Sequence, residues 1–274
     1  MFSSIIRPLV YPTLPIGNKR LEKHFSNKRV IITGASHGIG RELAYLLMGA
    51  KADLILVART ESELIKICED ANKAGCQATY RAIDLREREK LDAFCKELSE
   101  DNQQIDYFFA NAGKSIHRPI SEAYDRLHDY DRTIDLNYKS LVAISLAILP
   151  QMSRKGGCII YTSAVSTLFP LAPNWSAYHA SKCAGNAWCD TADAEFAKRN
   201  VRVKIAYLPL VHTQMSDINP TYQKMPAFSA KEAANVLAKL ASGLCSSYKP
   251  WWARIAAPIS YLLSPLVKFI YRHI

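Results

Sequence analysis

The sequence lacks the features that mark several classes of protein. Its seven cysteines are dispersed, odd in number and without a Cys-x-x-Cys pair, which argues against a disulfide framework or a zinc site and indicates free thiols in a reducing compartment. The seven histidines are equally dispersed, so we expect no metal site. The 274 residues contain no internal repeat and no low-complexity tract. Their number suits one large α/β domain or two small ones.

Long uncharged runs are also missing from the two ends of the chain. The first 16 residues are apolar with a single charge, but they lack the continuous core of a cleavable signal peptide. In residues 250–274 the longest uncharged run has 13 residues and two prolines, which is short of the roughly 20 residues needed to cross a bilayer. The sequence therefore predicts a cytoplasmic protein.

The net charge of +10 resides in the same two ends. Residues 1–29 and residues 233–274 each carry +5, whereas residues 30–232 hold 24 basic and 24 acidic side chains. No basic stripe with interleaved aromatic residues crosses this neutral centre, which argues against nucleic acid as a partner. An end that is both basic and apolar fits a membrane surface better.

The C-terminal residues 250–274 leave two interpretations open. Aromatic and basic residues flank the apolar run, as they do at the lipid–water boundary; they are Trp251, Trp252, Arg254, Lys268 and Arg272. This segment therefore forms a peripheral contact with the inner face of a membrane, or it packs as a helix pair on its own domain or on a second subunit.

Short apolar runs alternate with longer amphipathic ones between residues 29 and 207. The runs RVIIT, DLILVA, IDYFFA, GCIIYTS and VRVKIAY are typical of buried strands. Glu61–Lys73 and residues 91–98 have apolar residues at helical spacing. Alternating strands and helices predict an α/β, doubly wound fold, with a parallel sheet of about seven strands and helices on both faces.

A glycine-rich motif, TGASHGIG, follows the first predicted strand. Gly34, Gly38 and Gly40 have the spacing GxxxGxG between a strand and a helix. There, glycines let the backbone turn tightly and approach a pyrophosphate, which then lies at the helix N-terminus. Arg59 ends the next strand where an NAD site would usually have an acidic residue, so it favours the 2′-phosphate of NADP. His37 is a second candidate for that phosphate, and the alternative for Arg59 is a solvated loop residue.

The stretch SAYHASK places Tyr178 four residues before Lys182. Such a pair shares one helix face, and on its own it is usually surface decoration. Together with TGASHGIG, Asn111-Ala112-Gly113, Asn137 and Ser163, however, the pair resembles the short-chain dehydrogenases/reductases in order and approximate spacing. The resemblance covers roughly residues 22–245. It implies a Rossmann fold, a nicotinamide cofactor and hydride transfer at a carbonyl carbon.

The resemblance also implies a catalytic role for four residues. Tyr178 would act as the general acid, and Lys182 would lower the pKa of its phenol, which is near 10 when unperturbed. Ser163 would hold the substrate oxygen by a hydrogen bond. Asn137, in a helical stretch, would anchor a water molecule that links Lys182 to solvent; the alternative is an asparagine that bonds only its neighbours.

Further residues are expected to contact NADP(H). Asp84 would meet the adenine, and Thr213 the nicotinamide amide, while Asn111 either touches the cofactor or steadies the adjacent strand. Two positions depart from the family pattern: Leu210 stands where glycine is common, and Ala110 precedes Asn111 in place of a second asparagine. The expected cofactor-binding set is Gly34, Ser36, His37, Gly38, Ile39, Gly40, Arg59, Asp84, Asn111, Ala112, Gly113, Tyr178, Lys182, Pro209, Val211 and Thr213.

Residues 115–138 and 208–234 are similar to the single-domain bacterial fatty acyl-CoA reductases. That group implies a fatty acyl-CoA substrate reduced to an aldehyde, with a 3-keto lipid as the alternative. Residues 214–228 would form a lid, whose apolar side chains suit an acyl chain or pack on their own domain: Met215, Ile218, Tyr222, Met225 and Phe228.

Other interpretations stay open. They are a ketoreductase acting on a polyketide or a small secondary metabolite, and a non-catalytic NADP-binding scaffold or sensor. The family habit of pairing through the helix that bears Tyr178 implies a homodimer or homotetramer. We divide the chain into an N-terminal extension (1–27), a catalytic domain (28–245) and a C-terminal tail (246–274).

Overall fold

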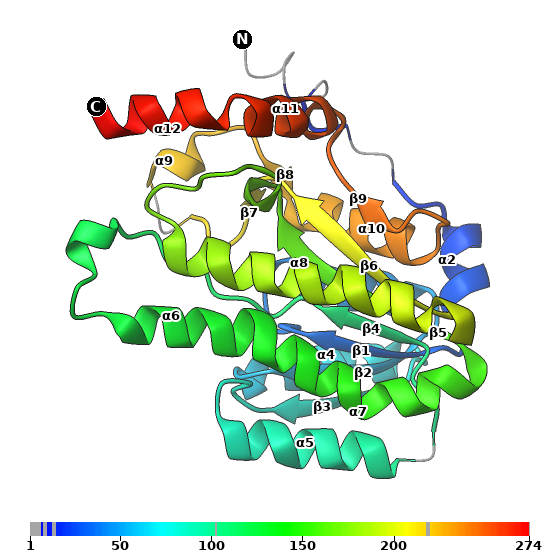
Figure 1. The fold of residues 1–274 in the computed structure, drawn as a ribbon. Helices are drawn as coiled ribbons and strands as arrows, with labels where there is room; N and C mark the ends of the chain where they lie inside the picture. Colours follow the sequence, from blue (N-terminus) through cyan, green and yellow to red (C-terminus); the bar gives the residue numbers. More distant parts are fainter. Residues whose placement is uncertain (1–6, 8–9, 13–14, 102, 218–219, 274) are drawn as a thin grey trace.

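Seven parallel strands form the central sheet, in the order β3-β2-β1-β4-β5-β6-β9 (Figure 1). The computed structural model describes residues 7, 10–12, 15–101, 103–217 and 220–273. The predicted doubly wound α/β fold, with about seven strands, is confirmed. The strands are β1 (Arg29–Thr33), β2 (Asp53–Ala58), β3 (Ala78–Ala82), β4 (Tyr107–Ala110), β5 (Gly157–Ala164), β6 (Val201–Leu208) and β9 (Ser247–Tyr248).

The strand order changes direction between β1 and β4, which are neighbours although they are far apart in the chain. In open α/β sheets, ligands bind outside the carboxyl ends of the strands at such a switch point. The glycine-rich motif follows β1, and Asn111 follows β4. The fold therefore brings these two segments to the position where a dinucleotide binds.

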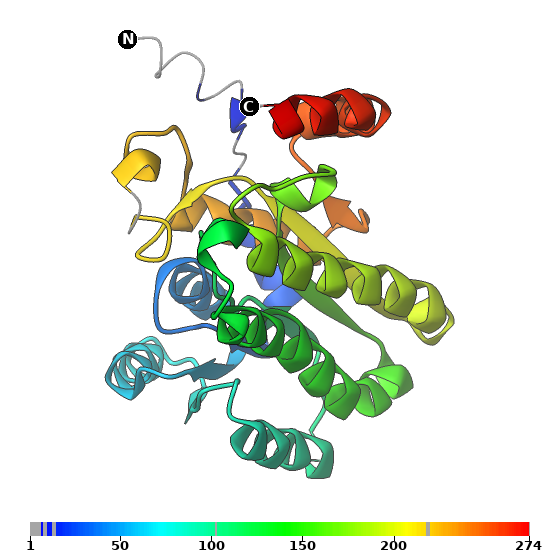
Figure 2. The same ribbon diagram turned by 60° about the vertical axis from the view of Figure 1, so that its left-hand side comes forward.

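Helices cover both faces of the sheet (Figures 1 and 2). One hydrophobic cluster joins the sheet to α3, α4 and α10, and the other joins it to α5, α7 and α8. Successive strand residues point to opposite faces, so Ile32 lies in the first cluster and Ile31 in the second. These helices are α3 (Gly38–Gly49), α4 (Glu61–Lys73), α5 (Arg88–Glu100), α7 (Ser140–Lys155), α8 (Ser176–Phe196) and α10 (Ala230–Ala241).

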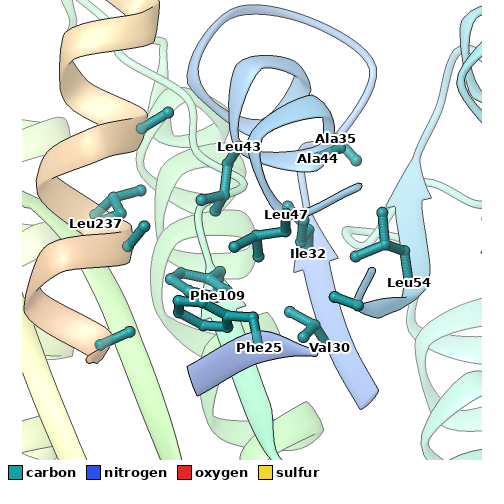
Figure 3. Packing of buried hydrophobic residues seen from close by; sticks show 14 of the residues in the cluster. Phe25, Val30, Ile32, Ala35, Leu43, Ala44, Leu47, Leu54, Phe109 and Leu237 are labelled. Carbon is teal, nitrogen blue, oxygen red and sulfur yellow. The ribbon is translucent and has the colours of Figure 1, made fainter. Parts of the chain in front are cut away.

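The N-terminal helix α2 (Asn18–Phe25) packs into the first cluster through Leu21 and Phe25. The Phe25 ring centroid lies 6.4 Å from that of Phe109, and Figure 3 shows both rings in one layer with Leu47 of α3 and Leu237 of α10. At the other end of the chain, β9 pairs with β6 at the edge of the sheet. The division into extension, domain and tail stays a prediction.

The last two helices, α11 (Trp251–Leu262) and α12 (Ser264–His273), lie together along one side of the molecule (Figure 1). Their axes bend by 73° at the break between them. In the described part of the chain, no single helix is long and apolar enough to cross a membrane, although this bent pair passes that test by length and composition. All seven cysteines are free thiols in this structure.

Candidate active site

The glycine-rich turn after β1 packs tightly against the end of β4. Gly34 and Gly38 have φ angles of +69° and +54°, in the left-handed region that glycine adopts without strain. A Cβ atom on Gly34 would lie 3.0 Å from the Ala112 Cα, and one on Gly40 would overlap the Gly34 carbonyl. Only glycine fits these close approaches, so no side chain covers the backbone of the turn at these positions. A phosphate-binding turn requires such an accessible backbone.

Thr33 and Asn111 connect the two strands beneath this turn. The backbone N–H groups of Asn111 and Ala112 both donate to the Thr33 hydroxyl oxygen at 3.1 Å, and the Asn111 side chain donates to the Thr33 carbonyl at 3.3 Å. The Asn111 side chain therefore steadies β1 against β4, which was one of its two expected roles. Its contact with a cofactor stays a prediction.

Three members of the expected cofactor set, Ser36, His37 and Thr213, lie at the glycine turn itself. The His37 Nδ1 lies 2.9 Å from the Ser36 hydroxyl oxygen. A Cβ atom on Gly38 would lie 3.1 Å from the Thr213 methyl group, so Thr213, which is far along the chain, reaches this turn. Three other members of the set are placed with their side chains inward: Ile39 packs against the core, and Pro209 and Val211 are buried.

Arg59 and Asp84 meet at the ends of β2 and β3. The Arg59 side chain is 68% exposed, and its Nη1 lies 3.7 Å from the Asp84 Oδ2. Arg86, which the sequence analysis did not identify, binds Asp84 more closely, with its Nη2 donating to the Asp84 Oδ2 at 2.6 Å. Hydrogen bonding from Arg86 lowers the pKa of Asp84. Asp84 is thus a fixed carboxylate, and Arg59 is free to turn toward an anion.

Lys182 extends from α8 to the end of β5. Its side chain is buried, and its Nζ donates to the Thr162 carbonyl at 2.7 Å. The Nζ also lies 4.7 Å from the centre of the Tyr161 ring. Burial lowers the pKa of Lys182 to about 7. Neither Thr162 nor Tyr161 was predicted, because both belong to a run that the sequence shows only as a strand.

Asn137 lies in a π-helical turn, Asp135–Lys139, between α6 (Leu127–Ile134) and α7. Such turns often occur at functional sites. The Asn137 side chain accepts from the Lys114 N–H at 2.8 Å and donates to the Ser181 hydroxyl at 2.8 Å. Its backbone carbonyl accepts from the Tyr161 hydroxyl at 3.0 Å. A Cβ atom on Gly113 would lie 3.2 Å from the Asn137 Oδ1 and 3.4 Å from the Lys182 Nζ, so both predicted side chains approach Gly113.

Tyr178 lies in the first turn of α8, one turn before Lys182, and it is partly exposed. Its ring meets that of Trp175 edge-on, at 5.9 Å between centroids. Burial raises the pKa of Tyr178 to about 12, so the expected lowering by Lys182 was wrong for this structure. The physical reason is that the phenol is desolvated, while the ammonium group turns toward the Thr162 carbonyl.

Ser163 ends the buried part of β5 and is 3% exposed. Its hydroxyl oxygen is buried and has no hydrogen-bond partner among the residues that the structure describes. Buried polar atoms are nearly always paired. An orphan hydroxyl at this edge of the sheet is therefore suited to bonding a ligand oxygen.

The predicted lid is divided between exposed and buried residues. Met215 and Met225 are 46% and 44% exposed, whereas Phe228 is fully buried in the short strand β8 (Phe228–Ser229), which pairs with β7 (Val211–His212). For Phe228 the packing interpretation was the right one. Tyr222, in α9 (Pro220–Gln223), stacks on Trp175 at 6.0 Å, and Ile218 lies outside the described residues.

Trp175 links the lid to the phenol, although the sequence analysis gave it no role. It contacts Tyr222 on one side, Tyr178 on another, and the His117 ring at 4.8 Å. His117 and Tyr222 are distant from Trp175 in the chain, and only its position three residues before Tyr178 could have drawn attention to it. In the described residues, no group of three or more His, Cys, Asp or Glu side chains could hold a metal ion.

Comparison with known proteins identifies the family. The model of the short chain dehydrogenases matches residues 28–223. The chain belongs to this family. This short-chain dehydrogenase is 36% identical to a fatty acyl-CoA reductase of Acinetobacter baylyi, over 80% of its own length and 76% of the relative. It is 32% identical to a fatty acyl-CoA reductase of Mycobacterium tuberculosis, with 84% and 79% covered.

Solved structures agree on the fold. A metagenomic short-chain oxidoreductase in complex with NADP superposes with a TM-score of 0.69 at 26% identity, over 82% of this chain and 96% of that one. A short-chain dehydrogenase/reductase from Mycobacterium marinum has a TM-score of 0.73 at 22% identity, over 84% and 96% of the two chains. The chain is therefore an oxidoreductase of a family that binds a nicotinamide cofactor.

Proposed function

We propose that this dehydrogenase uses NADPH to reduce a long-chain acyl-CoA thioester to the aldehyde. The single observation that carries the reaction is the group formed at the ends of β4, β5 and α8. There the orphan hydroxyl of Ser163 follows Thr162, whose carbonyl accepts from the buried Lys182, and Tyr178 lies one helical turn before that lysine. The similarity to two fatty acyl-CoA reductases supports the choice of substrate.

The residues present fit a dinucleotide. A Cβ atom on Gly34 or Gly40 would fill the space beneath the turn, and Arg59 presents an exposed guanidinium at the end of β2. Gly34, Gly38 and Gly40 would hold the pyrophosphate, Arg59 the 2′-phosphate, and Lys182 the ribose beside the nicotinamide. When bound, NADPH would supply the hydride for the carbonyl carbon.

Each catalytic residue then has one task. The Ser163 hydroxyl donates a hydrogen bond to the carbonyl oxygen and holds it near Tyr178. The Tyr178 phenol, protonated at neutral pH because its pKa is about 12, gives its proton to the oxygen as negative charge develops there. Loss of coenzyme A as the thiol from the resulting hemithioacetal leaves the aldehyde. Lys182, when protonated, supplies positive charge beside the phenol, and Asn137 holds Lys114 and Ser181 in place by its hydrogen bonds.

We infer the cellular setting from the same considerations. We place the enzyme in the cytoplasm, with peripheral contact to the inner face of a membrane. The proposed substrate is lipid-like, and the net positive charge of the chain lies in its N-terminal and C-terminal segments. A homodimer or homotetramer follows the family habit of pairing through the helix that bears Tyr178.

The test is NADPH oxidation by the full-length protein, with palmitoyl-CoA and a 3-keto lipid assayed in parallel. Oxidation with the thioester, and aldehyde among the products, is the expected result. Oxidation with the ketone alone would leave the catalytic residues in place and move the protein to the ketoreductases. Oxidation with neither would contradict the proposal.

Arg59 gives a separate prediction about the cofactor. Replacing Arg59 with serine is expected to raise the KM for NADPH roughly tenfold to a hundredfold, because a charge-assisted bond to the 2′-phosphate is lost. The KM for NADH should stay unchanged. Arg88→Ser is the matched control, since Arg88 is 81% exposed and bound to Asp92 on α5. Equal effects of Arg59→Ser on both cofactors would contradict the assignment.

A further inference from the structure

Exposed large apolar side chains gather on the last two helices. Of the 19 exposed large hydrophobic residues of the described chain, ten lie between residues 251 and 271. Monomeric soluble proteins rarely expose such contiguous apolar patches without a binding role. We call this surface the outer face; it consists of Trp251, Ile255, Ile259, Tyr261, Leu262, Leu263, Leu266, Phe269, Ile270 and Tyr271.

The inner side of α11 is fixed to the domain, so the outer face has a defined orientation. Ala253 is fully buried and Ala257 is 8% exposed. The Trp252 indole donates to the Val10 carbonyl at 3.0 Å, and its ring stacks on Phe169 at 6.5 Å. Small residues and one anchored tryptophan thus turn toward the protein, while the large side chains turn outward.

Charge decides which partner suits the outer face. Arg254, Lys268 and Arg272 lie on α11 and α12, and residues 233–274 contain no acidic side chain. A second copy docked through the same face would bring these cations against their own equivalents, which is unfavourable. An anionic lipid surface would instead meet cations with phosphates and apolar side chains with acyl chains.

The geometry favours a contact along the membrane surface. Twelve and ten residues in α11 and α12 are each short of the roughly 20 needed to span a bilayer. The 73° bend between them prevents one straight rod. Amphipathic helices with an apolar side and flanking cations lie in the headgroup region instead.

Helix α11 contacts a segment next to the candidate active site. Helix α11 contacts the 3₁₀ turn η3, Val165–Leu168, which begins two residues after Ser163. Phe169 follows this turn in the segment that leads to Tyr178. Figures 1 and 2 show α11 and α12 above this turn, on the side of the molecule where α9 also lies. A surface held at α11 would therefore lie beside the segment that joins the two catalytic positions.

We propose that the outer face binds the surface of an anionic bilayer, and that the carbonyl site consequently receives its lipid substrate from the membrane. The second part rests on the proposed function. The first part does not, because binding to vesicles requires no turnover.

The experiment compares the full-length protein with the double variant Leu262→Asp/Phe269→Asp. Leu262 and Phe269 are 80% and 60% exposed, so the substitutions place charge on the outer face without disturbing the core. The matched control is Leu244→Asp, at a residue 96% exposed that lies before α11. Binding is measured by co-sedimentation with vesicles of phosphatidylcholine alone and with vesicles that also contain phosphatidylglycerol.

We expect the wild type and the control to bind the phosphatidylglycerol vesicles, with binding that weakens as salt rises. The double variant should bind at least about tenfold more weakly. Equal binding by all three proteins, or binding that ignores phosphatidylglycerol, would overturn the membrane contact. A wild-type oligomer that the double variant reduces to smaller species would show that a second copy covers this face instead.

Activity tests the second part separately. The double variant should reduce a long-chain substrate carried in vesicles at least about tenfold more slowly than the wild type, by the same loss of binding. Its rate with a short, water-soluble acyl-CoA should be unchanged. Unchanged rates with both substrates, despite lost binding, would overturn delivery from the membrane. Absence of turnover in the wild type would contradict the proposed function and leave the vesicle result standing.

Discussion

Replacing Tyr178 with phenylalanine is expected to reduce turnover about a thousandfold, the range of an essential general acid. The change removes one hydroxyl group and keeps the ring, so the edge-on contact with Trp175 at 5.9 Å remains. Because burial raises the pKa of Tyr178 to about 12, the phenol carries its proton throughout the physiological range. The loss should therefore come from the missing proton and not from a rearranged site.

Cofactor binding separates this explanation from a structural one. The Kd of NADPH, measured by fluorescence titration, should change less than about twofold in Tyr178→Phe, which is within 0.5 kcal/mol. Tyr80→Phe is the matched control, because the Tyr80 hydroxyl bonds to Glu61 on the surface at 3.2 Å, away from α8. If Tyr178→Phe keeps more than a tenth of the wild-type rate, Tyr178 is not the acid. If NADPH binds and no carbonyl is reduced by the wild type, the non-catalytic alternative stands.

The regular part of the fold could be predicted because its signals are local. The helix predicted over Glu61–Lys73 has the bounds of α4, and its apolar residues Leu64, Ile67, Cys68 and Ala71 are the buried ones. The five named strands are buried in the sheet, where an apolar run is required on both faces. The two unnamed strands lie at the edges: β3 has no fully buried residue, and β9 has only two residues. Neither requires a strong apolar pattern.

The sequence indicates which residues belong to the candidate site better than it indicates what their side chains contact. Helical spacing correctly places Tyr178 and Lys182 on one turn of α8. Spacing does not determine where a long side chain ends, and the Lys182 ammonium lies against the Thr162 carbonyl and the Tyr161 ring. The predicted direction of the Tyr178 pKa shift depended on that missing information.

Contacts between segments that are distant in the chain could not be predicted either. Trp175 stacks on Tyr222 of the lid, and Arg86 holds Asp84 more closely than Arg59 does. The Tyr161 ring fits against α8 because Gly185 has no side chain, since a Cβ atom there would lie 2.5 Å from the Tyr161 ring. Such matches between a glycine and a ring 24 residues away become visible only when the chain is folded.

Lys182→Met is expected to abolish turnover and to stabilise the fold. The lysine is 4% exposed, and burial lowers its pKa from 10.5 to about 7. Each unit of such a shift corresponds to roughly 1.4 kcal/mol, which sets an upper limit near 5 kcal/mol on the cost of burying this group. The variant also loses the hydrogen bond from Lys182 to the Thr162 carbonyl. This loss offsets roughly 1–3 kcal/mol of the stability gained by removing the buried charge. We therefore expect the free energy of unfolding at pH 7 to rise by roughly 2 kcal/mol, measured by urea denaturation.

The stability difference between Lys182→Met and the wild type should depend on pH, because burial lowers the pKa of Lys182. Between about pH 7 and 10.5 the unfolded chain binds a proton at Lys182 that the folded chain does not, so wild-type stability rises with pH across this range. The methionine variant lacks that slope. Its advantage should consequently be largest at pH 7 and below, and should shrink toward pH 10.5.

Lys204→Met supplies the contrast, because it also removes a buried lysine. The Lys204 Nζ donates to the carbonyls of Leu240 and Gly243 at the end of α10, at 3.1 and 2.6 Å. Without this donor two carbonyls lose their partner, so this variant should be destabilised by roughly 1–3 kcal/mol. If both variants lose stability equally, and neither difference varies with pH, Lys182 is an ordinary structural lysine. Opposite signs would mean that the fold holds Lys182 at a cost in stability that only its chemistry explains.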